Sequence, residues 1–512
     1  MSFILAASDI NNVAVDTIMS ALLIILTLLA IIVTVWLLVR NINIEYTHIN
    51  VTKTMLIVVG IGVLLRFGLS FVAVGNRQEL YALYEAAEEW SKYGPGQYIA
   101  RYYFQTGRFV YPLQYFYAGL TAGSMISAGI SASSPIIQFV LKLPFMLADV
   151  CSAFILYKAA VKYLNKQTGV ILAGFVMLCP LFIFASSIWG SAYSVLAALL
   201  LGSFYAIVEK KYAVALIVYG AAMLWIRDSS YLFPMYPVYF VYIWAKQLKV
   251  VAKGEGNVAV AKKDVISIPL TVIGVIVVQY VICLPLMLER YSANFFQFIY
   301  QIFIYPLNQF EFYSNNALSI YNIFGKGGWN TDVISRDQRA PYFVAAFAIV
   351  VAVLTIVIYM CGKNRAVLTF TAAFSLFILH TTYFDFSITS LLPVIILLLM
   401  SFILIKDKRI LKVMFAESIL MILMMVCVFV FGGYFNNLPF DVFTSPSYTG
   451  SMQITSNTFG IVVAIGLSVL SIANLVYMTL VVISISMSEK RSTLGGNEKA
   501  SVSTALKYFI KK

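Results

Sequence analysis

The sequence predicts an all-α membrane protein, a polytopic bundle of about thirteen spanning helices. Three observations support this. Of the 512 residues, 61% are apolar and only 11% are charged, whereas soluble domains contain about 25% charged residues. The apolar residues form long runs, and a bilayer core needs about 20 of them per helix. These runs are continuous, which argues against a transmembrane barrel, because its strands alternate in segments of about 10 residues.

About fourteen apolar segments follow one another along the chain. They lie at residues 17–39, 55–74, 112–132, 136–157, 169–187, 191–208, 212–226, 230–245, 265–288, 341–361, 366–384, 387–405, 413–433 and 459–487. The first follows an acidic start with Asp9 and Asp16, so we expect it to stay as an extra transmembrane helix rather than to be cleaved.

Basic residues indicate the topology. The loops Lys246–Lys263, Lys363–Arg365 and Lys406–Lys412 and the tail Lys490–Lys512 are basic and should be cytoplasmic, whereas Tyr434–Thr458 has no Lys or Arg and should lie outside. The net charge of +13 therefore reflects topology, and no nucleic-acid partner is expected.

The acidic N-terminus should lie outside the cell membrane and the C-terminus in the cytoplasm. An odd number of crossings follows, and we expect the segment 112–132, rich in Gly, Ser and Ala, to enter the membrane without crossing it.

These features divide the chain into four parts. They are an N-terminal helix and linker at 1–54, a core at 55–405 with extracytoplasmic loops 75–111 and 289–340, C-terminal helices at 406–487, and a basic tail at 488–512. The five cysteines all lie in or beside apolar segments and form no CxxC pair, so they are expected to be packing residues.

The run from Gly75 to Leu113, between two apolar segments, mixes carboxylates, basic residues and aromatics at length. Its residues Glu85, Glu88 and Glu89 would share one face of a helix by their spacing. One interpretation is an interfacial helix with a solvated acidic face. The other makes Glu79, next to the membrane, a catalytic carboxylate.

Two further pairs of charged residues lie in or beside apolar segments. Lys142 and Asp149 are seven residues apart on one helix face, and such residues are by default functional or paired. The alternatives are helix-to-helix pairing for Asp149 and snorkelling to a membrane face for Lys142. Arg227 could bind a phosphate through its planar fork or form an ion pair with Asp228.

The loop 289–340 contains Asn315, Asn316, Asn322 and Trp329, whose side chains suit sugar hydroxyls and sugar faces; a purely structural loop is the alternative. His380 ends a helix, where it is either a packing group or a base. There is no second histidine nearby, so no histidine-based metal site is evident.

Several short motifs occur in a fixed order between residues 55 and 405. They are Glu79 and the aromatic run ending in Tyr-Pro-Leu at residues 111–113; Lys142-x-Pro144 with Asp149; Pro180 followed by Trp189 and Gly190; the segment Arg227–Pro234; the run NNALSIYNIF; and His380-Thr-Thr-Tyr383. In this order they resemble the GT-C superfamily, integral membrane glycosyltransferases that use a polyprenyl-phosphate-linked sugar outside the cytoplasm.

The resemblance has departures. Glu79 stands where the family has an aspartate, and Tyr193 stands where it has a second acid. Thr381 and Thr382 replace the Glu and Arg of the last motif, and one proline of a Pro-Pro-Leu motif is missing. These losses leave room for a non-catalytic member of the family.

The resemblance implies a membrane glycosyltransferase that moves a sugar from a polyprenyl-phosphate donor to a cell-surface glycan or lipid acceptor. Glu79 would deprotonate the acceptor or help to hold a divalent metal, and Arg227 with Arg77 would bind the donor phosphate. The outer-loop residues, His380 and Tyr383 would bind substrate. The alternatives are a non-catalytic partner in polysaccharide assembly and a lipid-linked glycan flippase or polymerase. A flippase should carry charges inside many helices, whereas this chain is expected to hold them at helix ends.

Overall fold

The computed structural model describes twelve stretches of the chain. They are residues 22–38 apart from 23 and 35, then 51–71, 77–95, 111–131, 134–254, 256–287, 296, 317–324, 340–362, 365–383, 386–431 and 458–487. Every regular element within these residues is helical, as predicted. Prolines occupy the first turn of α5, α7 and α9, where the missing N–H would have no partner in the helix.

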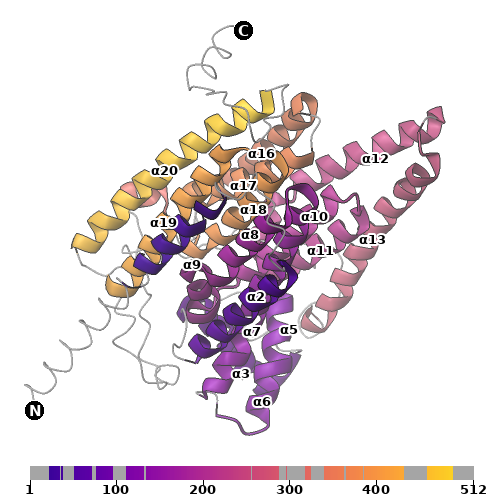
Figure 1. The fold of residues 1–512 in the computed structure, drawn as a ribbon. Coiled ribbons are helices and arrows are strands. Elements are labelled where there is room, and N and C mark those ends of the chain that lie inside the picture. Colours follow the sequence, from indigo (N-terminus) through magenta and orange to yellow (C-terminus); the bar gives the residue numbers. More distant parts are fainter. Residues whose placement is uncertain are drawn as a thin grey trace, which may run out of the picture.

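The elements are named as in Figure 1. They are α2 (Val51–Ser70), α3 (Arg77–Tyr93), α5 (Pro112–Ala118), η3 (Gly119–Gly123), α6 (Ser124–Ser127), α7 (Pro135–Tyr163), α8 (Lys166–Leu178), α9 (Pro180–Ile183), η4 (Phe184–Trp189), α10 (Tyr193–Val208), α11 (Tyr212–Trp225), η5 (Arg227–Leu232), α12 (Met235–Lys253), α13 (Val258–Met287), α15 (Ile320–Ile323), α16 (Ala340–Gly362), α17 (Arg365–Thr382), η8 (Ile388–Ser390), α18 (Leu391–Ile405), α19 (Lys408–Phe431) and α20 (Thr458–Met487).

Six helices in the described residues are long and apolar enough to cross a membrane, or seven if a bent pair counts as one span. This length and composition mark a multi-pass membrane protein. The count of about thirteen crossings stays a prediction, because α10, α11 and the described apolar part of α17 are shorter than a typical span.

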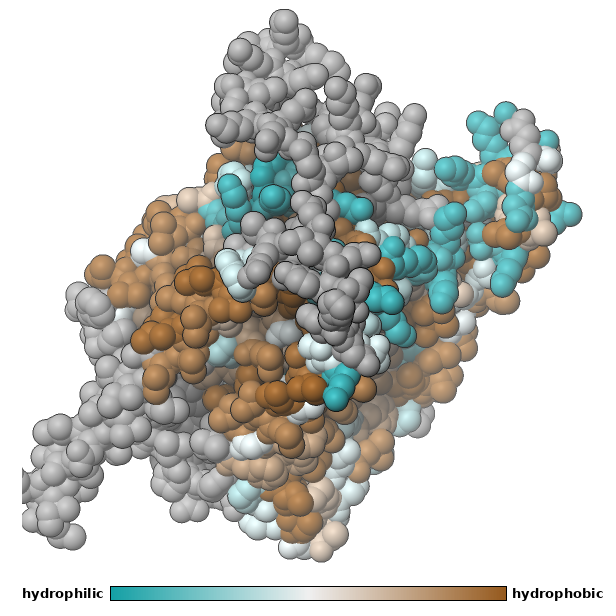
Figure 2. All heavy atoms as spheres, viewed as in Figure 1, coloured by the Kyte–Doolittle hydropathy of each residue, from teal (hydrophilic) through white to brown (hydrophobic). Residues whose placement is uncertain are grey.

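The helices differ in how far they are buried in the bundle. Helix α18, apolar on every side, is almost wholly buried and packs against α7, α10, α17 and α19 (Figure 1). Helix α13 lies at the edge and exposes apolar side chains, among them Ile266, Leu270, Ile273 and Val277. Figure 2 shows such apolar residues over much of one face of the protein, as expected of a surface that contacts lipid.

The apolar segment 169–187, expected to be one helix, is broken. Helix α8 ends at Leu178, and the following pair of α9 and η4 is bent from it by 44°. The physical reason is Pro180, which has no backbone N–H and therefore cannot donate to the carbonyl of Val176. The bent half ends at Gly190, whose φ of 75° suits glycine.

Helices α2 and α7 are antiparallel neighbours. Arg66 of α2 contacts Asp149 of α7, while Ser70, one turn later in α2, contacts Lys142, about two turns earlier in α7. Helix α2 therefore ends, and α7 begins, at the same end of the bundle. We call this the α3 end, because α3 packs there against α5, η3, α6 and α7.

The described part of the segment 112–132 packs against α3 at this end. It contains one run of helical backbone, in which α5, η3 and α6 follow without a break over 112–127. This run is shorter than about 20 residues. Trp90 of α3 packs against it so closely that a Cβ on Gly119 would lie 2.0 Å from the indole. Glycine is therefore required at 119.

The opposite end of the bundle carries most of the described basic loops. Lys162 at the end of α7 forms an ion pair with Glu209 in the turn after α10. Arg409 at the start of α19 binds Asp407 and Ser484 near the end of α20. The tip of the α12–α13 hairpin is also polar in Figure 2. The turn Lys406–Lys412 and the α12–α13 hairpin tip, both predicted to be cytoplasmic, therefore lie at this end.

Candidate functional site at the α3 end

Helix α3 forms one wall of the α3 end. Its apolar face, including Leu80, Leu83 and Tyr84, is buried, while the three glutamates of the opposite face are partly exposed. Glu88 forms an i,i+4 ion pair of 2.8 Å with Lys92. The predicted amphipathic helix is therefore present. The backbones of Arg77 and Glu79 lie in its first turn, but their side chains fall outside the described part of the structure.

Helix α7 supplies the polar face opposite α3. Lys142 is fully buried, so its expected snorkelling to a membrane face is wrong. Its Nζ donates a hydrogen bond of 3.3 Å to the carbonyl of Ser70. A Cβ built on Gly190 would lie 3.3 Å from Leu80 and 3.5 Å from Lys142. The Trp189–Gly190 turn therefore meets both α7 and the residue that follows Glu79.

One turn before Lys142, α7 carries a residue that the sequence analysis did not single out. Gln138 is 1% exposed, and neither atom of its side-chain amide has a hydrogen-bond partner among the described residues. A buried amide without partners is unfavourable by about 1–3 kcal/mol per group. Gln138 therefore marks a position where a polar ligand or water would gain hydrogen bonds.

The turn after η4 is joined to the turn before α12. The hydroxyl of Tyr193 donates a hydrogen bond to a carboxylate oxygen of Asp228, and both side chains are buried. The indole of Trp225 donates to the carbonyl of Ala192 at 3.0 Å, and Gln114 donates to the carbonyl of Trp225 at 2.6 Å. Tyr193 therefore binds the carboxylate of Asp228 in η5 and does not itself provide an acidic side chain. The side chain of Arg227 lies outside the described part.

An aromatic contact extends this region to the last motif. The ring of Tyr231 in η5 lies 5.1 Å from the ring of Tyr383, which follows α17. His380 is buried in the same helix. Its Nε2 accepts a hydrogen bond of 3.0 Å from the backbone N–H of Leu318, so its Nδ1 carries the proton and donates to Ser390 at 2.6 Å. Both ring nitrogens are therefore occupied by hydrogen bonds within the protein, so neither is open to accept a substrate proton. His380 has a structural role here.

The described part of the outer loop is fixed to the bundle at this end. Asn322 is buried and donates to the carbonyl of Ala317 at 2.8 Å and to Ser468 at 2.7 Å. Asn322 thus acts as a structural residue here. The other outer-loop candidates, Asn315, Asn316 and Trp329, lie outside the described residues.

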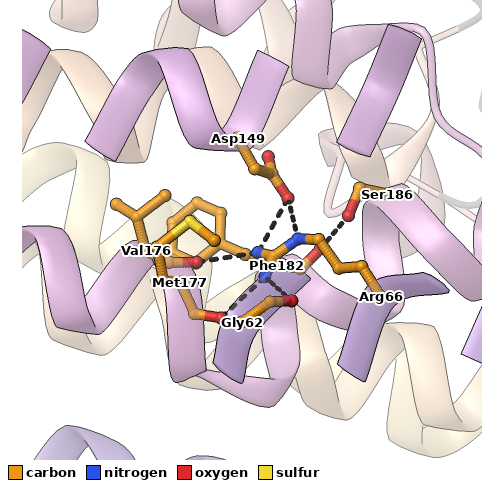
Figure 3. A network of polar contacts seen from close by, with 7 residues as sticks. All are labelled: Gly62, Arg66, Asp149, Val176, Met177, Phe182 and Ser186. Carbon is orange, nitrogen blue, oxygen red and sulfur yellow. Dashed lines mark hydrogen bonds and ion pairs between the residues drawn. The ribbon is translucent and has the colours of Figure 1, made fainter. Parts of the chain in front are cut away.

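Asp149 is the centre of a buried network that the sequence analysis only partly foresaw. Figure 3 shows Arg66 reaching from α2 to Asp149, with its Nε 3.0 Å and its Nη2 2.9 Å from the same carboxylate oxygen. The expected helix-to-helix pairing of Asp149 is therefore confirmed. Its partner lies 83 residues away in the chain.

The same guanidinium caps the broken helix. Its Nη2 donates to the carbonyl of Val176 at 2.9 Å, and its Nη1 donates to those of Met177 and Gly62 at 2.6 and 3.1 Å. Pro180 leaves the Val176 carbonyl without a helical donor, and Arg66 replaces that donor. A cation is also favourable at a helix C-terminus. Arg66 therefore stabilises the bend that leads to Trp189 and Gly190.

These buried groups correct one expectation about charge. Arg66, Lys142, Asp149 and Glu417 are charged-type residues buried inside apolar helices. Charges were expected to be concentrated at the outer helix ends, which argued mildly against a flippase; Asp149 and Glu417 lie deeper within their helices.

The described residues contain no group of three or more His, Cys, Asp or Glu side chains that could hold a metal ion. Of the acids near the α3 end, Asp149 is engaged by Arg66 and Asp228 by Tyr193. The described donor set does not fit a divalent metal. No model of a known protein family matches this chain, and neither does any curated protein.

Proposed function

We propose that the protein is a membrane glycosyltransferase of GT-C type, which transfers a sugar from a polyprenyl-phosphate donor to a cell-surface glycan or lipid. One observation supports this: segments far apart in sequence that carry the resemblance meet at the α3 end. Gly190 meets Leu80 and Lys142, Tyr193 meets Asp228, and the ring of Tyr231 meets that of Tyr383. The positive-inside rule supports an outward orientation of this end, because most described basic loops lie at the other end.

The proposed reaction is an inverting displacement at the anomeric carbon. Glu79, in the first turn of α3, would take the proton of the acceptor hydroxyl as the bond to the sugar forms. Arg227, with Arg77, would stabilise the departing phosphate, since a guanidinium can bind two of its oxygens at once. The apolar outer surface of the bundle offers the lipid tail a place in the membrane.

A non-catalytic partner in polysaccharide assembly is the second candidate, and specific contacts favour it. Tyr193, in place of the family's second acid, is engaged by Asp228. The hydroxyls of Thr381 and Thr382 donate to carbonyls of their own helix, at 3.0 and 2.7 Å. His380 is fully engaged as well. The residues at these family positions hold the fold together, so the enzyme reading depends on Glu79.

The test is Glu79→Gln, which keeps the side chain's shape but removes its charge. If the protein is an enzyme, removal of the general base should lower the reaction rate by about 10²–10⁴-fold. Cells that make the variant should then show an altered surface-glycan composition, which is the readout. Glu79→Asp should retain substantial activity, because it restores the residue usual in the family.

Glu88→Gln is the matched control. It lies on the same helix and changes a partly exposed carboxylate paired with Lys92, so the glycan should not change. If Glu79→Gln leaves the glycan unaltered at normal protein level, while deletion of the gene alters it, the non-catalytic candidate replaces the enzyme.

A further inference from the structure

A second buried acid lies far from the motifs, in the C-terminal helices. Glu417 is in α19, nine residues after Lys408 and therefore about 14 Å along the helix axis. Its side chain is fully buried. An ionisable group at such depth in an apolar helix is expected to be functional or paired.

Glu417 has only neutral partners. The hydroxyl of Ser471 donates to its Oε1 at 2.7 Å, and the amide of Asn474 donates to its Oε2 at 2.9 Å and to the carbonyl of Val413 at 3.1 Å. Both donors belong to α20, the helix packed along α19.

No cation in the described residues faces this carboxyl. Helix α19 packs against α18, α20 and η8, and its Phe415 contacts Phe175 of α8. The charged and titratable groups of these elements and of the turn before α19 are Lys166, Lys406, Asp407, Lys408, Arg409, Lys412, Cys427 and Tyr477, and none has a described contact with Glu417. Arg409 is engaged by Asp407 at the opposite end. Two neutral hydrogen bonds do not replace the hydration of an ionised carboxylate, whose burial without a counter-charge is far costlier than that of a neutral group.

Further polar side chains lie near this acid on α20. Ser468, Ser471 and Asn474 recur every three residues on one face of α20. Ser468 accepts a hydrogen bond from Asn322, whose own Oδ1 is buried without a partner in the described part of the chain. Ser468 therefore lies one helical turn from a partner of Glu417 and contacts the outer loop, and intramembrane acids with polar neighbours are typical of proton-binding sites.

We propose that Glu417 is a proton-binding site within the membrane, held as a neutral carboxylic acid between α19 and α20. The ligand is a proton, which joins one carboxylate oxygen and leaves the other as a hydrogen-bond acceptor. This site is separate from the α3 end and does not depend on glycosyl transfer.

The test is infrared difference spectroscopy on the full-length protein in lipid nanodiscs. A protonated carboxylic acid has a carbonyl band distinct from the bands of a carboxylate. The spectrum of the wild type minus that of Glu417→Gln should contain the acid band near neutral pH and gain carboxylate bands only in alkaline buffer. The same subtraction with Glu209→Gln is the matched control. It should give carboxylate bands, because Glu209 is paired with Lys162.

Carboxylate bands at Glu417 near neutral pH would overturn the proposal. A second outcome would also overturn it: if sodium chloride, compared with choline chloride at the same pH, converts the acid band into carboxylate bands, the ligand is a metal cation. Unchanged amide bands in each variant show that the protein has kept its fold.

Discussion

Asp149 and Glu417 are both buried carboxyls in apolar helices, but their surroundings differ. Asp149 lies against the guanidinium of Arg66, whereas Glu417 contacts only a hydroxyl and an amide. An acid buried in a low-dielectric environment must gain either a cation or a proton. The two helix pairs therefore illustrate both solutions, α2 with α7 the first and α19 with α20 the second.

The difference extends to what each acid holds in place. Arg66 binds Asp149 and the freed carbonyls of α8 together, so the pair fixes three helices and the bend after Leu178. That bend sets the position of Trp189 and Gly190 at the α3 end. Glu417 joins only two helices through neutral hydrogen bonds. Removing one partner of the Arg66–Asp149 pair should therefore lower the free energy of unfolding more than removing a partner of Glu417. It should also shift Trp189 and Gly190 at the candidate site.

The largest effect is expected for Arg66→Met. It leaves Asp149 buried without a counter-charge and removes the donors to Val176 and Met177, and breaking such a pair costs about 3–5 kcal/mol. Unfolding of the purified protein in detergent, followed by helix content against denaturant, measures this.

The double variant Arg66→Met, Asp149→Leu is the control. It removes both charges, so it should recover much of the loss, although the carbonyls of α8 stay without donors. If the double variant is no more stable than Arg66→Met alone, the uncompensated charge is not the cause.

An intermediate test compares two matched amide substitutions. Asp149→Asn should be strongly destabilising, because it leaves the Arg66 charge uncompensated. Glu417→Gln should change the free energy of unfolding by no more than about 1 kcal/mol, the typical value of a single hydrogen bond, because the acid is already neutral. The same unfolding measurement applies to both. Equal losses in the two variants would mean that Glu417 is ionised, and the contrast between the two regions would disappear.

The sequence predicts where the helices lie, but not which residues of different helices contact one another. Long apolar runs predicted the helical membrane fold, and the spacing of Glu85, Glu88 and Glu89 predicted the amphipathic α3. Arg66 escaped notice because one charge in the run 55–74 does not disturb its apolar pattern. Its partners in other helices lie 83 to 111 residues away, and one sequence contains no signal for such distances.

Two residues, Pro180 and Glu417, carry local sequence signals that indicate more of the structure than the motifs alone. Pro180 was used for the resemblance, although it also predicts the break between α8 and α9. Glu417 lies inside the apolar segment 413–433 and went unremarked, although a carboxyl at that depth is unusual. Gln138 could be found only in three dimensions, because its lack of partners depends on the packing around α7.

The smallest effect is expected outside the membrane, at Glu209. Its Oε1 accepts a hydrogen bond of 2.9 Å from Tyr163, and Lys162 pairs with its other oxygen. Burial alone would raise the pKa of Glu209, but the hydrogen bonds from Lys162 and Tyr163 and the charges of Lys162 and Lys211 outweigh it and hold the pKa below the ordinary value of 4.5. Because the folded pKa is the lower one, the stabilisation is fully present above pH 4.5 and is lost as the pH falls through the folded pKa.

Thermal unfolding of the wild type and Glu209→Gln across this pH range tests the sign. The wild type should unfold at a slightly higher temperature near neutral pH, and the difference should shrink in acid as Glu209 takes up a proton. Added salt should reduce the difference, because Lys162 is half-exposed and its charge is screened. A difference that grows in acid would contradict the direction of the pKa shift. With Glu209 ionised, Asp149 paired and Glu417 protonated, the three acids would form a series in which burial decides how each charge is handled.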